Sequence, residues 1–282
     1  MSSPILSRIS NDADDAYRGV HSIPEYIEST LNDERELYKY FAINSDLGFV
    51  ENIIRDNTIK FGNPCQFNDP FDCMSVIGIP SFNDTKRMLE ELARSSGRTF
   101  SNESYRRAYD DIVRGQVDTY RTRSLGMYGL LCLSGKWDNI LMWAHYSNSH
   151  TGIVTVFQFD KTHEFYQRMM KVQYRKGITY FEMDHANCGK KIWESFSTKD
   201  PIWEYENEYR VINIPSGPHM SDGNGIKPFP RELLKGFIFG LKMCRKARGD
   251  IIKMVSTHYP TLQLFDIVTD ESEVRLHKVA IH

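Results

Sequence analysis

The segment from residue 203 to residue 214 constrains the fold of this chain more than any other. Its first eight residues, Trp-Glu-Tyr-Glu-Asn-Glu-Tyr-Arg, combine aromatic rings with three carboxylates and an arginine, and they lead into the apolar run Val-Ile-Asn-Ile. Because successive side chains of a strand alternate between its faces, a strand here would carry on one side Glu204, Glu206, Glu208 and Arg210. Like charges on one face destabilise a sheet unless that face meets water, cations or a ligand. The segment is therefore either a solvated strand edge or a strand of catalytic carboxylates.

The composition favours a globular protein with a substantial apolar core. The chain has 282 residues, of which 40% are hydrophobic and 12% aromatic, enough for one large domain or two small ones. The formal net charge of -2 gives no overall attraction to nucleic acid or anionic membranes, so such a partner would need a local patch. No apolar run approaches the roughly 20 residues that span a bilayer. We therefore expect no membrane partner.

The cysteines and the N-terminus predict a cytoplasmic protein. The five cysteines are scattered, without a close pair of the kind that binds zinc, which predicts reduced thiols. The chain is polar within a few residues of Met1 and lacks the apolar core of a signal peptide. The oligomeric state is left open by these patterns.

Strand patterns alternate with helical patterns along most of the chain. Apolar, β-branched and aromatic residues predict strands at 37–41, 58–62, 128–134, 152–159, 172–174, 208–214, 236–239, 262–268 and 275–281. Helical spacing predicts helices near 47–57, 138–147, 190–198 and 245–258, and two within 84–123. The chain shows no regular βαβ rhythm and no glycine-rich phosphate loop, which argues against a Rossmann or P-loop fold. We predict a single α+β domain over residues 37–282, with a mixed, largely antiparallel sheet flanked by helices, preceded by an extension over residues 1–36.

The segment 67–72, Phe-Asn-Asp-Pro-Phe-Asp, places two apolar rings among turn-forming polar residues. Asn, Asp and Pro build local hydrogen-bonded turns, so a structural loop anchored by its two rings is one interpretation. In the alternative, Asn68, Asp69 or Asp72 holds polar groups of a ligand over that rigid turn.

The segment 137–152 is the second dense cluster of aromatic and histidine residues. In a helix over 138–147, Trp143 and Tyr146 lie on neighbouring faces and serve either as core or as a platform for a ligand. His145 and His150 are five residues apart, which differs from the four-residue spacing of a helical metal site. A metal held by both histidines and a carboxylate from residues 204–208 is an alternative. Otherwise His145 is a candidate for acid–base chemistry, because imidazole titrates near neutral pH.

The second helix within 84–123 is rich in arginine. It carries Arg106, Arg107, Arg114, Arg121 and Arg123 together with three aspartates. Pairing of these charges within the helix predicts a solvated, salt-bridged face. A surface that grips phosphate or nucleic acid is the alternative.

Taken in order, these motifs resemble domain-of-unknown-function family 2971. The segments that carry the resemblance are Leu-Tyr-Lys-Tyr (37–40), Phe-Asn-Asp-Pro-Phe-Asp (67–72), Leu-Cys-Leu-Ser (131–134), Trp-Asp-Asn (137–139), Met-Trp-Ala-His-Tyr (142–146), His-Thr-Gly-Ile (150–153), the 203–210 segment and Phe-Ile-Phe-Gly (237–240). The resemblance covers about residues 37–281 and leaves the N-terminal extension outside it. It implies membership of the family but, by itself, no particular reaction.

A second resemblance is to the ADP-ribosyltransferase fold. Those enzymes open with a short strand that contacts NAD, followed by a helix, and close with a strand carrying a Glu/Gln-x-Glu pattern. Here Tyr38-Lys39-Tyr40 precedes the helix predicted from residue 47, and Glu206-Asn207-Glu208 comes late in the chain. The first strand has Lys39 between two tyrosines where the family has a His or Arg. The resemblance implies NAD as the co-substrate.

The roles that this resemblance implies follow the chemistry of glycosidic bond cleavage. Glu208 would stabilise an oxocarbenium-like centre and hold a ribose hydroxyl, and Glu206 would orient or deprotonate the acceptor. Aromatic rings would stack on nicotinamide or adenine, and Lys39 or Arg210 would engage the pyrophosphate. In an alternative role, Arg210 neutralises a neighbouring carboxylate as a structural pair. The full set of cofactor-binding candidates is Tyr38, Lys39, Tyr40, Asn68, Asp69, Trp143, Tyr146 and Arg210.

The leading functional hypothesis is an NAD-dependent ADP-ribosyltransferase or NAD glycohydrolase of a bacterial or phage cytoplasm. Its catalytic candidates are Glu208, Glu206 and His145, and its acceptor would be a protein or nucleic acid. A role as a toxin or in phage defence is compatible with it. One alternative is a non-catalytic module that binds a nucleotide or a protein, and another is a metal-dependent hydrolase or nuclease.

Overall fold

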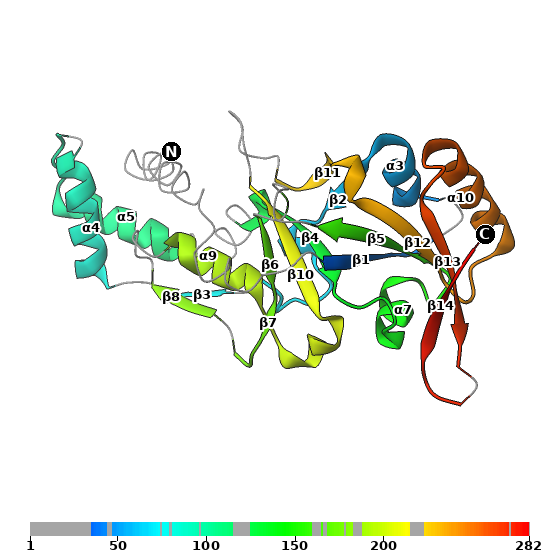
Figure 1. Ribbon diagram of the computed structural model, residues 1–282. Helices are drawn as coiled ribbons and strands as arrows, with labels where there is room; N and C mark the ends of the chain where they lie inside the picture. Colours follow the sequence, from blue (N-terminus) through cyan, green and yellow to red (C-terminus); the bar gives the residue numbers. More distant parts are fainter. Residues whose placement is uncertain are drawn as a thin grey trace.

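The computed structural model describes residues 35–43, 47–73, 75–78, 81–95, 97–114, 125–159, 165, 168–177, 179–182, 188–214, 223–270 and 272–281. They form an α+β fold built on an eight-stranded mixed sheet with helices on both faces (Figure 1). The predicted fold class is therefore confirmed in its general form. None of the described helices is both long and apolar enough to cross a membrane.

The eight-stranded sheet is mostly antiparallel. In spatial order its strands are β14 (Leu276–Ala280), β13 (Gln263–Thr269), β12 (Leu234–Phe239), β5 (Ile153–Phe159), β1 (Arg35–Phe41), β4 (Gly129–Ser134), β10 (Glu208–Asn213) and β6 (Met169–Lys171). Among the described pairs of this sheet, β12 and β13 run parallel, joined by helix α10 (Arg245–His258), and the others are antiparallel. Three central strands from distant parts of the chain, β1, β4 and β10, thus lie next to one another.

The remaining elements surround this sheet. Three small sheets pair β2 (Thr58–Phe61) with β11 (Gly225–Pro228), β3 (Ser75–Gly78) with β8 (Thr179–Glu182), and β7 (Gln173–Tyr174) with β9 (Thr198–Lys199). The other helices are α3 (Phe49–Asp56), α4 (Phe82–Ser95), α5 (Asn102–Arg114), α7 (Ile140–Tyr146) and α9 (Cys188–Ser197). Short 3-10 helices are η2 (Pro64–Gln66), η3 (Leu125–Met127), η4 (Pro201–Glu206) and η5 (Arg231–Leu233).

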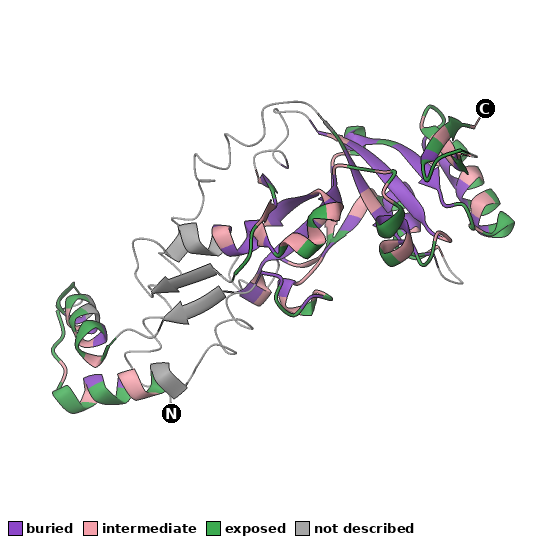
Figure 2. Cartoon of the chain, turned by 90° about the horizontal axis from the view of Figure 1, so that it is seen from below, coloured by how far each residue is buried: buried purple, intermediate pink, exposed green. Residues whose placement is uncertain are grey.

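The two faces of the large sheet are covered differently. Odd-numbered residues of β1, β4 and β10, such as Leu37, Leu133 and Val211, pack in one apolar cluster with helices α3 and α10. Even-numbered residues point to the opposite face, where they divide between two clusters. Helix α7 covers the cluster that contains Tyr38 and Tyr40, through Trp143. Helix α9 covers the cluster that contains Ile212, through Phe196. Figure 2 shows that buried residues concentrate in the sheet and in these covering faces.

The sheet is nearly divided between β1 and β4. These strands share one residue pair in register, Tyr38 with Ser134, whereas β1 pairs with β5 through seven residues and β4 with β10 through six. At its start β4 instead pairs with Gly62, just after β2, through two backbone hydrogen bonds to Leu130. The backbones of β1 and β4 therefore diverge, and the polar groups of β4 that face β1 need other partners.

The acidic segment is not a continuous strand, which corrects the prediction for residues 204–206. Asp200 accepts a hydrogen bond from the backbone of Ile202, and Pro201 occupies the first turn, so the chain forms the 3-10 helix η4. Asn207 then adopts a left-handed conformation (φ 44°, ψ 55°), and β10 begins at Glu208. Asn tolerates this conformation better than most residues. Glu204 is exposed, so the four charged residues do not share one strand face.

Other element boundaries differ from the predictions in small ways. Helix α7 begins at Ile140, because the Asn139 side chain caps its first backbone N–H groups. Strand β1 begins at Arg35, inside the predicted extension, whose residues 1–34 lie outside the described part of the chain. The division into an extension and a domain therefore stays a prediction. The arginine-rich helix is described to residue 114, so Arg121 and Arg123 lie outside the described residues.

Candidate functional site

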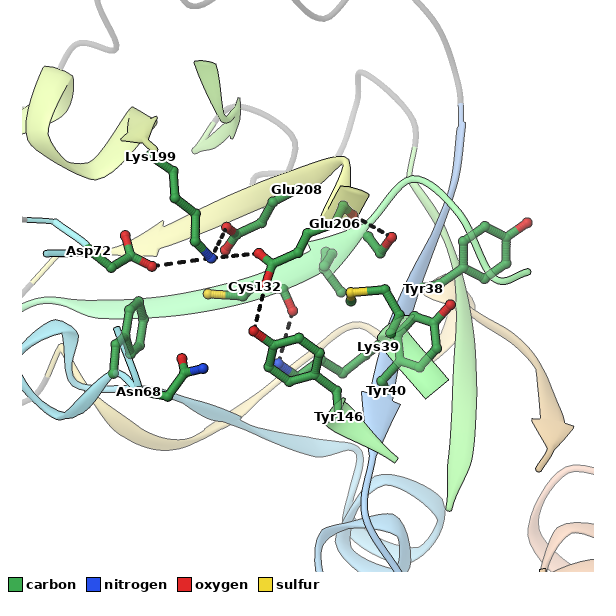
Figure 3. A pocket seen from close by; sticks show the side chains of 14 residues that line it. Tyr38, Lys39, Tyr40, Asn68, Asp72, Cys132, Tyr146, Lys199, Glu206 and Glu208 are labelled. Atoms are coloured by element: carbon green, nitrogen blue, oxygen red, sulfur yellow. Dashed lines mark hydrogen bonds and ion pairs between the residues drawn. The ribbon is translucent and has the colours of Figure 1, made fainter. Parts of the chain in front are cut away.

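A cavity of ≈ 190 Å³ lies where β1 and β4 diverge. Its walls come from five parts of the chain: β1, the loop after η2, β4, helix α7, and the segment from β9 to β10. Figure 3 shows the side chains converging on it from these elements. Seven of the predicted site residues line it, namely Tyr38, Lys39, Tyr40, Asn68, Tyr146, Glu206 and Glu208.

The strand register aligns three of the wall residues. Ser134 of β4 lies opposite Tyr38 of β1 on one side and opposite Glu208 of β10 on the other. Residues directly opposite in a sheet point to the same face, so these three side chains form a row across the central strands. The row brings the early tyrosine strand and the late acidic strand to one cavity, although they are separated by about 170 residues of sequence.

One ammonium group joins the carboxylates of this cavity. The Nζ atom of Lys199 lies 2.5 Å from Glu206, 3.1 Å from Glu208 and 3.4 Å from Asp72. All four side chains are at most 6% exposed. Lys199 comes from the two-residue strand β9, which β7 holds in parallel register through Tyr174. The Tyr174 hydroxyl in turn accepts a hydrogen bond of 2.8 Å from the backbone N–H of Glu208.

Arg210 lies behind this group and is fully buried. Its Nε and Nη2 atoms donate to both oxygens of Glu208, and Nη2 also donates to both oxygens of Asp72. Its Nη1 atom donates to the carbonyl of Phe196 and to the sulfur of Cys73. Arg210 is not among the cavity walls, so its contacts agree with the structural pairing role rather than with binding a pyrophosphate.

The two glutamates differ in their electrostatic surroundings. Burial and the charge of Glu208 raise the pKa of Glu206 above its ordinary value. Burial acts in the same direction on Glu208, but Arg210 and Lys199 outweigh it and lower the pKa of Glu208. Neighbouring carboxylates with pKa values pushed in opposite directions can act one as a fixed anion and the other as a proton acceptor or donor.

The turn that carries Glu206 is fixed to β4 and α7. The Ser134 hydroxyl donates to the carbonyl of Glu206 at 2.7 Å, and the Asn139 side chain donates to the carbonyl of Tyr205 at 2.8 Å. The backbone N–H of Gly135 donates to the carbonyl of Asn207. The approach is close, because a Cβ added at Gly135 would lie 2.5 Å from the side-chain amide nitrogen of Asn207. These contacts explain how a 3-10 helix and a strand can present two carboxylates to one place.

Tyr146 connects helix α7 to the carboxylates. Its hydroxyl donates to Glu206 at 2.5 Å, on the carboxyl oxygen that Lys199 does not contact. Burial and the nearby Glu206 raise the pKa of Tyr146, so the phenol keeps its proton. Asn68, from the loop after η2, acts on the pKa of Tyr146 in the opposite direction. Glu206 and Tyr146 both line the cavity, and the Tyr146 hydroxyl can relay a proton from the cavity to Glu206.

The wall formed by β1 is more apolar. The rings of Tyr38 and Tyr40 line the cavity, while their hydroxyls donate to Glu36 and to the carbonyl of Lys136. Lys39 reaches across the gap between β1 and β4 and donates to the carbonyl of Cys132 at 2.9 Å. The ammonium thus occupies the place of a missing strand–strand hydrogen bond, with further donors left for a ligand.

Four predicted site residues lie elsewhere. Trp143 is fully buried and donates to the carbonyl of Trp137, so it is core. Asp69 accepts from the backbone of Phe71 and stabilises its own turn, as the structural interpretation predicts. The anchoring of the loop by both rings was wrong for Phe71, which is 64% exposed. His145 is exposed and shares a hydrogen bond of 3.0 Å with the hydroxyl of Tyr205 rather than entering the cavity. Arg210, described above, is the fourth.

Several residues of this cavity could not be predicted as site residues from the sequence. Lys199 was not predicted, because a lone lysine after a helix carries no signal of its own. Ser134 and Cys132 appear only as parts of a strand, and Asp72 was weighed as a ligand-binding residue without being placed in the site. The alternation of β4 could have placed Ser134 and Cys132 on the same face.

The metal alternative finds no support in the described residues. No group of three or more His, Cys, Asp or Glu side chains in the described ranges is arranged to hold a metal ion. His150 stacks on Trp143 at 6.2 Å between ring centroids, whereas His145 lies by Tyr205. Of the carboxylates in residues 204–208, Glu206 and Glu208 instead pair with Lys199 and Arg210.

No family model matches the chain, and comparisons with curated proteins and with solved structures find no significant match.

Proposed function

We propose that the protein cleaves the N-glycosidic bond of NAD, releasing nicotinamide and transferring ADP-ribose to water or to a macromolecular acceptor. One observation carries the proposal: the register row of Tyr38, Ser134 and Glu208 brings the early tyrosine strand and the late Glu-x-Glu segment to one cavity. These are the two segments in which the chain resembles the ADP-ribosyltransferase fold. We further propose that the chain is a member of family 2971 and acts in the cytoplasm as a toxin or in phage defence.

The size of the cavity agrees with a single ring rather than with a whole dinucleotide. A pocket for a drug-sized ligand spans roughly 300–1,000 Å³, whereas an engineered cavity of roughly 150 Å³ binds benzene. At ≈ 190 Å³ the cavity suits a pyridine carboxamide, with the ring against Tyr38 and Tyr40 and the glycosidic bond toward the carboxylates. The rest of the nucleotide would lie outside, along the surface.

The carboxylates supply the chemistry that this bond requires. Loss of nicotinamide leaves positive charge on the ribose, and an ionised Glu208 would stabilise that charge. Glu206, whose pKa is raised, would take the proton of the incoming water or acceptor hydroxyl. Lys39 lines the cavity and would meet the pyrophosphate where the nucleotide leaves the cavity.

The test is nicotinamide release from NAD by the full chain, alone and with protein, DNA and RNA acceptors. Glu208→Gln should lower the rate by about 10²–10³-fold, because the fixed anion is lost while the side-chain shape is kept. Glu204→Gln is the matched control, since Glu204 belongs to the same segment but is exposed. Both variants are first checked for folding by circular dichroism. Absence of release, or equal rates in wild type and Glu208→Gln, would reject the proposal.

A specific observation favours a second candidate, a non-catalytic module that binds a nucleotide. Every carboxylate oxygen of Asp72, Glu206 and Glu208 already has a hydrogen-bond donor in the protein. A network satisfied in this way can be structural. Under this candidate, NAD or a related nucleotide raises the thermal unfolding midpoint without being consumed, since a ligand of the folded state stabilises it.

A further inference from the structure

We infer that Lys199 is a positioning residue for proton transfer in this cavity: its ammonium fixes one oxygen of Glu206 and leaves the other to share a proton with Tyr146. This inference deepens the proposed function and rests on it. Nothing in the resemblances described above assigns a role to Lys199.

The first argument is the unequal division of cations among the three carboxylates. Asp72 and Glu208 each contact both Arg210 and Lys199. Of the cations that the structure describes, Lys199 alone pairs with Glu206. The charge state of Glu206 therefore depends on Lys199, whereas the other two carboxylates keep a second cation if Lys199 is removed.

The second argument is the geometry around Glu206. Lys199 contacts Oε2 and Tyr146 contacts Oε1, each at 2.5 Å, so the two partners lie on opposite oxygens. The Lys199 ammonium also lies 5.0 Å from the centroid of the Trp203 ring, which adds a cation–π contact and restricts its position. Lys199 is 5% exposed and leaves little room for water at this oxygen. The side of Glu206 that remains for chemistry is the Tyr146 side, at the cavity wall.

The proton step balances without a further reagent. The bond between ribose C1′ and the pyridine nitrogen breaks, and its electron pair leaves with the nitrogen as neutral nicotinamide. The oxygen of water or of an acceptor hydroxyl forms the new bond to C1′, and its proton passes to the Glu206 carboxylate, directly or through the Tyr146 hydroxyl. Glu206 must be ionised to accept it. Burial and Glu208 oppose ionisation by raising the pKa of Glu206, and Lys199 and Tyr146 favour it.

The experiment measures the titration of Glu206 without requiring activity. Glutamate side chains are labelled with carbon-13, and the Glu206 carboxyl signal is assigned by its loss in Glu206→Gln. In Lys199→Met we expect the midpoint to rise by at least about one pH unit, a tenfold tighter hold on the proton. Lys199→Arg keeps the charge and should return the midpoint most of the way. An unchanged midpoint in folded Lys199→Met would overturn the inference.

A second variant keeps the inference testable if Lys199→Met does not fold. Tyr146→Phe removes one hydrogen bond to Glu206 but leaves the buried charges balanced, and it should also raise the midpoint, by less than the loss of Lys199. A midpoint that stays in place in Tyr146→Phe contradicts the inference in the same way.

The pH profile of NAD cleavage then separates this inference from the proposed function. If Glu206 is the base, the acidic limb of the profile should move upward in Lys199→Met by the same amount as the carbon-13 midpoint. A limb that stays in place while the midpoint moves would overturn the proton-transfer role. A shifted midpoint in a protein that releases no nicotinamide would reject the NAD-cleavage proposal while leaving the control of Glu206 by Lys199 in place.

Discussion

Two groups of polar residues each contain a carboxylate whose pKa is lowered, but they differ in burial and in how far apart their members lie in sequence. In the cavity, Glu208 is buried and is held by cations from distant segments. In the turn between β13 and β14, Asp270 lies at the surface, and hydrogen bonds from Ser272, together with His277, lower its pKa. The first group spans residues 72–210, and the second lies within residues 270–277.

The difference shows that a perturbed pKa alone does not mark a functional site. Asp270 accepts from the backbone N–H groups of Ser272 and Glu273, which is the ordinary chemistry of an Asp-initiated turn. Glu208 faces a cavity, next to a second carboxylate shifted in the opposite direction. Glu208 differs from Asp270 in two ways: its partners come from segments far apart in sequence, and it lies beside a space for a ligand.

The largest expected difference between the two groups is in the free energy of unfolding. Arg210→Met leaves Glu208 and Asp72 buried with a single remaining cation and should lower stability by about 3–5 kcal/mol. Arg275→Met removes the exposed pair with Glu273 in the β13–β14 turn and should change stability by less than about 0.5 kcal/mol. Chemical denaturation of both variants measures this. Comparable losses would mean that burial does not separate the two groups.

The next difference concerns pH. The folded-state pKa of Glu208 is lowered, so its contribution to stability is present above pH ~4.3, its unfolded value, and is lost as the pH falls toward the folded value. The pKa of Glu206 is raised, so its contribution is present below pH ~4.3 and is lost as the pH rises through the folded value.

Unfolding curves at several pH values should therefore show opposite effects of the two substitutions. Glu208→Gln should flatten the loss of stability in acid, and Glu206→Gln should flatten a loss above pH ~4.3. Each slope is at most about 1.4 kcal/mol per pH unit for one proton. If both substitutions changed the pH dependence of stability in the same direction relative to the wild type, the opposing pKa shifts of Glu206 and Glu208 would be contradicted.

A smaller difference separates two serines that both donate to an acidic residue. The Ser134 hydroxyl is buried and joins β4 to the Glu206 carbonyl, across 72 residues of sequence. Ser134→Ala leaves that carbonyl without its donor and should cost about 1–3 kcal/mol, measured by denaturation. The same variant should slow NAD cleavage, because the turn that carries Glu206 loses its attachment. Full stability in Ser134→Ala would show that the turn is held by other contacts.

The smallest effect is expected at Ser272. Its hydroxyl donates to Asp270 at 2.6 Å within the turn. Ser272→Ala should raise the pKa of Asp270 toward its ordinary value, seen by NMR titration. It should move the unfolding midpoint less than Ser134→Ala does and leave the rate of NAD cleavage unchanged. A loss of cleavage in this variant would make the turn part of the site after all.

The elements that the sequence predicted well are those whose signals are local. Residues 153–159 form a strand because β-branched and aromatic side chains suit a buried strand. Helix α3 ends at Asn57, whose left-handed conformation stops it as predicted. The acidic segment was wrong as a strand because Asp200 and Pro201 begin a helical turn upstream, and that start signal outweighed the alternation that follows it.

The site was only partly predictable for a different reason. The tyrosines of β1 and the glutamates near β10 were found because their motifs are dense. Lys199 reaches the carboxylates because β7 and β9 pair and direct it at residues up to 127 positions away, and no local pattern records such a pairing. Arg210 could be assigned to a ligand or to a structural pair from sequence, and only its complete burial decides between them.

The single residue pair that joins β1 to β4 gives the molecule a seam. On one face of the sheet, helix α7 covers the half that contains β1 and helix α9 covers the half that contains β4 and β10, whereas on the other face one apolar cluster spans both halves. A larger or smaller side chain at Tyr38 or Ser134 would alter the space between these halves. It would also remove a hydrogen bond to an acidic residue, because Tyr38 donates to Glu36 and Ser134 donates to the carbonyl of Glu206. The width of this space and the position of the acidic residues are therefore coupled through the one residue pair that joins β1 to β4.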